Sequence, residues 1–136
     1  MKLLLKTIHR LVQYKVPNST LGFNTSLPHI SVIDYIKRIV HHGSLGKDVL
    51  DITALYLVRL SQTLSLHVGN IHRLLGVLLL IAAKMENDDH YTNKYWSKLL
   101  GIPLHEVNHL EKELLIELQY NLYPFATHRE MLALIQ

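Results

Sequence analysis

The segment from Leu74 to Ala83 constrains the fold most, because none of its ten residues carries a polar side chain. A helix that is apolar all round must be covered by other elements on every side. Ten residues are also too few to cross a bilayer, which takes about 20. The segment therefore predicts a buried central helix, with no transmembrane span and no membrane partner.

The rest of the chain alternates between loop-forming and helix-forming stretches. Proline, glycine, asparagine and serine cluster at residues 16–28, 43–48, 86–93 and 101–103, and the apolar spacing between the clusters is helical. This pattern predicts helices near 31–43, 48–61, 70–85, 93–100 and 103–120, after an N-terminal helix and before the start of a further helix at 127–136. We expect an all-α fold, a five-helix bundle around the central apolar helix, with an additional N-terminal helix.

Composition narrows the class of protein further. With 136 residues, of which 49% are hydrophobic, one domain with a real core is expected. The chain has no cysteine, which fits a reducing compartment and predicts an intracellular protein of the nucleus or cytoplasm. Lys6 interrupts the first leucines too early for a secretory signal, but the basic, acid-free start leaves a mitochondrial presequence as the alternative to an ordinary packed helix.

Two charged residues interrupt apolar helix surfaces. Projected at about 100° per residue, Glu111 falls inside the leucine stripe of the 103–120 helix. Lys84 ends the central apolar run directly after Ala82 and Ala83. A carboxylate on a buried face is costly unless something pairs with it. Either the two residues pair with each other or reach water, or both face the backbone of a partner protein beside the shallow surface that the alanines leave.

The string His105-Glu106-Val107-Asn108-His109 matches the HExxH zinc motif, and Glu130 lies at a suitable distance for a third ligand. Both histidines point away from the leucine stripe, however, whereas a zinc site needs ligands turned into an enclosed cleft. There is also no Gly-rich phosphate loop, and no pattern suggests a nucleophile with its base. We therefore expect no enzyme, no catalytic residue, no metal and no cofactor.

A series of short segments follows one family's order along the chain. The series runs through Pro28-His29-Ile30-Ser31-Val32-Ile33-Asp34-Tyr35-Ile36-Lys37-Arg38-Ile39, Tyr56-Leu57-Val58-Arg59-Leu60, Asn70-Ile71-His72-Arg73-Leu74-Leu75 with Ala82-Ala83-Lys84, then Asp88-Asp89, Tyr91, Asn93, Tyr95 and Gly101-Ile102, and finally Asn108-His109-Leu110-Glu111 with Leu118, Tyr120 and Leu122. In order and spacing it resembles the P-type, or phosphate-pathway, class of cyclins. The resemblance implies a single cyclin box over residues 28–136, preceded by an N-terminal helix and linker over residues 1–27 that pack on the box.

The resemblance also implies a function. A cyclin is a non-catalytic regulatory subunit that binds and activates a cyclin-dependent protein kinase by docking on its C-helix, in cell-cycle or nutrient-linked control. Lys84 and Glu111 fall on the lysine and glutamate with which cyclins grip the kinase. The apolar groove that receives the kinase helix would be lined by Ala82, Met85, Leu115, Tyr120 and Leu122. A monomer is expected when the chain is isolated.

One departure from the family pattern keeps other functions open. Val58 stands where the family usually has aspartate, and the arginine that pairs with this aspartate in mitotic-type cyclins falls on His29. Both charges are thus absent together, which leaves no orphan charge and leaves open an adaptor that binds a kinase without activating it. A cyclin-like module that binds nucleic acid or transcription factors is the other alternative, but it needs clustered basic residues, and the net charge is only +3. We expect no nucleic-acid partner.

Overall fold

The structure, a computed structural model, describes residues 1–13, 30–87 and 91–135. These residues form seven α-helices and no strand: α1 (Lys2–Leu11), α2 (Val32–Gly43), α3 (Lys47–Leu60), α4 (Ile71–Glu86), α5 (Asn93–Leu100), α6 (Leu104–Glu117) and α7 (His128–Ile135). The all-α prediction is confirmed, and every predicted helix is found within a few residues of its expected ends.

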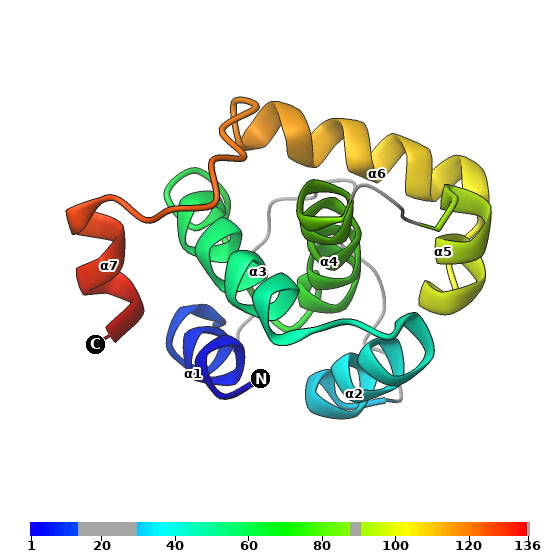
Figure 1. Cartoon of the computed structure of the whole chain (residues 1–136), viewed down its shortest axis with the longest axis horizontal. Coiled ribbons are helices and arrows are strands. Elements are labelled where there is room, and N and C mark those ends of the chain that lie inside the picture. Colours follow the sequence, from blue (N-terminus) through cyan, green and yellow to red (C-terminus); the bar gives the residue numbers. More distant parts are fainter. Residues whose placement is uncertain (14–29, 88–90, 136) are drawn as a thin grey trace.

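The apolar helix α4 lies at the centre of the bundle (Figure 1), where it packs against α2, α3, α5 and α6. All of its side chains from Leu74 to Ala83 are buried. The neighbouring helices cover it with apolar faces of their own, such as Ile36 and Ile39 of α2 and Leu110 of α6. The predicted central helix is therefore confirmed. No helix in the described part of the chain has both the length and the apolar content needed to cross a membrane.

The bundle is closed at one side by contacts among α2, α4 and α5. The Tyr35 hydroxyl of α2 donates a buried hydrogen bond of 2.8 Å to the carbonyl oxygen of Leu100, and burial raises the pKa of this tyrosine to about 12. Gly76 lets the helices approach, because a Cβ there would lie 2.9 Å from Leu100 Cδ2 and 3.2 Å from the Tyr35 hydroxyl oxygen. This packing fixes the end of α5 against α2.

The N-terminal helix α1 lies beside α3 (Figure 1) and buries Leu4, Thr7 and Ile8. The chain after it is tied to the α3–α4 connection, where the Gln13 amide donates to Leu66 O at 2.8 Å and the Val68 amide donates to Gln13 O at 3.0 Å. Helix α1 is thus held against the bundle through α3. The division at residue 27 stays a prediction, because the linker over residues 14–29 lies outside the described residues.

The Tyr35 hydrogen bond gives a direct test of this packing. We expect Tyr35→Phe to lower the free energy of unfolding by about 1–2 kcal/mol, since it leaves the buried Leu100 carbonyl without its donor. Tyr95→Phe is the matched control: it removes the exposed 2.8 Å bond from the Tyr95 hydroxyl to His42 O, and we expect a change below about 0.5 kcal/mol. Urea unfolding midpoints at unchanged m value measure both, and equal losses would contradict the assignment.

Candidate functional site

Lys84 and Glu111 form an ion pair that joins the end of α4 to the middle of α6, with 2.8 Å between Lys84 Nζ and Glu111 Oε2. The other carboxylate oxygen, Glu111 Oε1, accepts a hydrogen bond of 2.9 Å from the Asn93 side-chain amide. The carboxylate in the leucine stripe is therefore fully partnered. The pair is not sealed inside the core, because 28% of the Lys84 side chain and 17% of the Glu111 side chain remain exposed.

The apolar residues predicted to line the groove differ in how exposed they are. Met85 and Tyr120 are 45% and 64% exposed. Leu115 and Leu122 are partly buried and pack against the core, and Leu115 lies one turn after Glu111 on the same face of α6. Ala82 does not belong to this surface, because it is 0% exposed and points into the core. In this structure Ala82 therefore lines no accessible groove, and its contact with a kinase stays a prediction.

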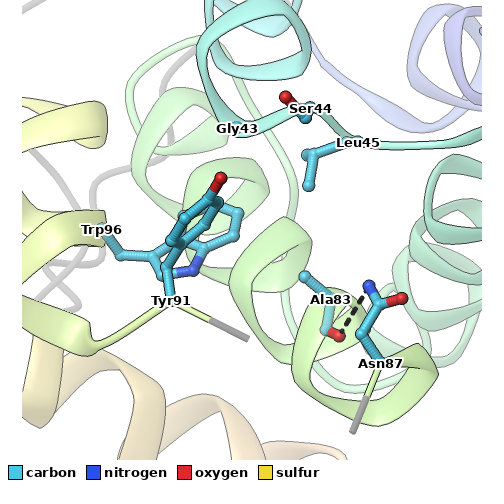
Figure 2. Close-up of a pocket in the computed structure, with 7 residues that line it drawn as sticks. All are labelled: Gly43, Ser44, Leu45, Ala83, Asn87, Tyr91 and Trp96. Carbon is cyan, nitrogen blue, oxygen red and sulfur yellow. Dashed lines mark hydrogen bonds between the residues drawn. The ribbon is translucent and has the colours of Figure 1, made fainter. Parts of the chain in front are cut away.

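The shallow surface expected beside the alanines is found at Ala83. This residue lines a pocket of about 300 Å³ between the ends of α2 and α4 and the start of α5 (Figure 2), together with Gly43, Ser44, Leu45, Asn87, Tyr91 and Trp96. Figure 2 shows the Asn87 side-chain amide donating to Ala83 O, at 3.3 Å. Sequence reasoning placed Ala83 beside this shallow surface but did not find Asn87, because a loop residue carries no periodicity signal.

The turn after α6 has an unusual backbone that sets the position of Tyr120. Gln119 and Tyr120 both adopt left-handed conformations, with φ of 54° and 56°, which cost non-glycine residues of order 1 kcal/mol or more each. Two side chains of α3 donate hydrogen bonds to carbonyl oxygens of this turn. The Tyr56 hydroxyl donates to Leu122 O at 2.7 Å, and Arg59 Nη1 donates to Asn121 O at 3.0 Å.

Arg59 is also the main link between the bundle and α7. Its Nε lies 2.8 Å from Glu130 Oε2 and its Nη2 lies 3.3 Å from Glu130 Oε1, a two-pronged pair in which the side chains are only 7% and 16% exposed. Nη2 also donates to Phe125 O at 3.2 Å. The hydrogen bond from Arg59 lowers the pKa of the Glu130 carboxyl. Sequence reasoning used Arg59 only as part of a motif and did not find this role.

The same contacts account for the zinc-motif residues. Glu106 forms an ion pair with Arg73 of α4, and Glu130 is held by Arg59. His105 and His109 are exposed, as their place opposite the leucine stripe predicted. Within residues 1–13, 30–87 and 91–135, no three histidine, aspartate or glutamate side chains are grouped as metal ligands. Glu106 and Glu130, the acidic residues of the zinc hypothesis, are therefore each engaged by an arginine.

Residues 6–122 match the family model of cyclins. The chain belongs to the cyclin family. It is 35% identical over 102 residues to the PHO85 cyclin-like protein psl1 of Schizosaccharomyces pombe and 31% identical over 114 residues to PHO85 cyclin-7 of Saccharomyces cerevisiae. It is 28% identical over 123 residues to cyclin-U2-2 of Arabidopsis thaliana. These relatives confirm the resemblance to P-type cyclins.

The alignments cover 72%, 74% and 84% of this cyclin and 42%, 40% and 54% of psl1, cyclin-7 and cyclin-U2-2, respectively. The cyclin thus spans about half the length of these relatives. Val58, the departure from the family pattern, is buried in α3, where an apolar side chain is well suited. Its expected partner position, His29, and the Asp88-Asp89 match lie outside the described residues.

The Arg59 pair predicts a pH-dependent contribution to stability. We expect Glu130→Gln to lower the free energy of unfolding by about 1–2 kcal/mol at pH 7, because it removes a charge-assisted, mostly buried pair. A carboxyl whose pKa is depressed in the folded state stabilises the fold above its unfolded pKa, and loses this effect as the pH falls through the folded one. The difference in free energy of unfolding between Glu130→Gln and the unsubstituted cyclin should therefore narrow as the pH falls below 4.5, the ordinary pKa of a glutamate carboxyl.

Unfolding midpoints across this pH range measure the effect. Glu113→Gln is the matched control, because Glu113 makes no ion pair with any described residue. A difference between Glu130→Gln and the unsubstituted cyclin that stayed constant as the pH fell would mean that the ion pair does not cause it.

Proposed function

We propose that this cyclin is a regulatory subunit, without catalysis of its own, that binds and activates a cyclin-dependent protein kinase. It would bind through a docking face made of Lys84, Met85, Glu111, Leu115, Tyr120 and Leu122. The observation that carries the proposal is the partly exposed ion pair between Lys84 and Glu111, next to the exposed Met85, in a member of the cyclin family. The names of psl1 and cyclin-7 connect those relatives with PHO85, which supports a kinase partner of that kind here.

The chemistry of the docking face suits a helix of another protein. Met85 and Tyr120 supply exposed apolar area, and its removal from water by a partner favours association. An amphipathic helix is the common occupant of such a surface. An ammonium group has three N–H donors, and Lys84 uses its group for Glu111 alone among the described residues, so donors are left for backbone carbonyls of the partner.

Activation would follow from unequal binding to two states of the kinase. A cyclin that binds the state with the inward C-helix more tightly shifts the kinase population towards that state. In that state the C-helix glutamate reaches the lysine that positions ATP. All groups that transfer the phosphoryl group then belong to the kinase, and the cyclin would act in the nucleus or cytoplasm, in cell-cycle or nutrient-linked control.

The charge pair allows a test that separates docking from folding. A single reversal at Lys84 or Glu111 also breaks the bond inside the cyclin, so its effect on binding would be ambiguous. The double variant Lys84→Glu with Glu111→Lys restores an internal pair with reversed direction. We expect it to fold with nearly unchanged thermal stability and to bind the kinase at least about tenfold more weakly, a loss of about 1.4 kcal/mol.

The partner is first identified by pull-down from native lysate with the unsubstituted cyclin, and affinity is then measured with the purified kinase. Lys112→Glu is the matched control, because Lys112 is exposed on α6 next to Glu111 but outside the docking face. Normal kinase binding by the folded double variant would remove Lys84 and Glu111 from the docking face.

Activation is tested separately from binding. Adding the purified cyclin to the purified kinase should raise the rate of phosphorylation of a peptide substrate at least about tenfold, if the active conformation is the minor one without cyclin. Val58 in place of aspartate favours the second candidate, an adaptor that binds without activating. That candidate predicts the same affinity with an unchanged rate, so binding without a rise in rate would decide for the adaptor.

A further inference from the structure

A second surface pocket lies between the ends of α2 and α5 and shares no residue with the docking face. It has a volume of about 460 Å³ and is lined by Arg38, His42, Tyr95, Lys98, Leu99 and Gly101. Three of these six residues carry basic side chains and none carries a carboxylate. The pocket therefore offers positive charge and N–H donors to whatever enters it.

The walls of this basic pocket are held in place by the fold. Arg38 Nη2 donates to Leu99 O at 3.3 Å, and the guanidinium carbon lies 5.3 Å from the centre of the Tyr35 ring. On the other side, the bond from the Tyr95 hydroxyl to His42 O ties α5 to α2. A Cβ at position 101 would touch Arg38 Nη2 at 3.7 Å, so the glycine there leaves the guanidinium uncovered by a side chain.

The cations of the pocket lack anionic partners. Neither Arg38 nor Lys98 pairs with a carboxylate in the described part of the chain, and even Asp34, one turn before Arg38 on α2, makes no ion pair with it. Basic side chains do stabilise helix C-termini, and α2 and α5 both end here, each with about half a negative charge. Two full positive charges exceed these two half charges, so the pocket keeps a positive potential.

We propose that this pocket binds the phosphate group of a phosphorylated serine or threonine in a partner protein. A guanidinium presents paired N–H groups that match two oxygens of a phosphate, and the lysine ammonium adds a point charge. Tyr95 is stacked on Tyr91 with 4.2 Å between ring centres. Its exposed ring offers an apolar surface to the residue of the partner that neighbours the phosphorylated one. The inference that the phosphate belongs to a phosphoprotein rests on the proposed kinase partnership. The inference that the cyclin alone binds phosphate does not depend on that partnership.

The test is a titration of the ¹⁵N-labelled full chain by NMR, with the probe peptide acetyl-Ala-Ala-phosphoserine-Ala-Ala-amide. We expect the amide signals of Tyr95 and Gly101 and the Arg38 side-chain signal to shift, with affinity in about the millimolar range. The unphosphorylated peptide should leave them unchanged. Inorganic phosphate should bind more weakly than the peptide, and equal or tighter binding would assign the pocket to the free ion and overturn the phosphoprotein source.

Two lysine variants make the residue assignment falsifiable. Lys98→Gln should weaken binding of the phosphopeptide about five- to tenfold. Lys37→Gln removes the same charge from an exposed position next to Arg38 that does not line the pocket, and it should change the affinity less than about twofold. Thermal unfolding verifies that both variants are folded.

Equal losses for the two lysine variants, or no response of the pocket signals to the phosphopeptide, would overturn the proposal. Lys98→Gln should still bind the kinase normally, because it lies outside the docking face. Failure of phosphate binding and failure of kinase binding are thus separate outcomes of separate measurements.

Discussion

The constraint on which the structure depends is the covering of α4. Because this helix has no polar side from Leu74 to Ala83, the helices around it must bring apolar faces to it from several directions. Charges are tolerated only where α4 leaves the core, and Lys84 stands at that point. Lys84, Met85 and the pocket at Ala83 thus lie at the end of the most buried helix, which gives this surface a rigid support.

The ion pair between Lys84 and Glu111 connects stability with recognition. Glu111 lies among the leucines of α6, and its bonds to Lys84 and Asn93 remove the cost of a lone buried carboxylate. Partly exposed pairs contribute only about 0–1 kcal/mol to stability, so the fold gains little from keeping two charges here in place of apolar side chains. Their partial exposure beside Met85 is better explained by contact with another polypeptide, which is the basis of the proposed function.

Arg59 organises the other side of the docking face from a distance. It lies on α3 and reaches the turn after α6, the carbonyl of Phe125 and the carboxylate of Glu130. The backbone at Gln119 and Tyr120 is strained, and the strain persists because Arg59 and Tyr56 bond the carbonyls that follow. The position of Tyr120 therefore depends on a residue that is not itself part of the surface.

The sequence by itself determined the helices, the central place of α4, the family and the two charged positions, because periodicity, turn residues and a charge inside an apolar stripe are local signals. Only the tertiary structure decided that Ala83 lines a pocket whereas Ala82 lies fully in the core, that Lys84 and Glu111 bond to each other, and that Glu130 pairs with Arg59. It also brought Arg38 and Lys98, 60 residues apart, into one pocket. The reason is physical: exposure and pairing depend on which helix faces meet, and those contacts join residues that no spacing along the chain relates.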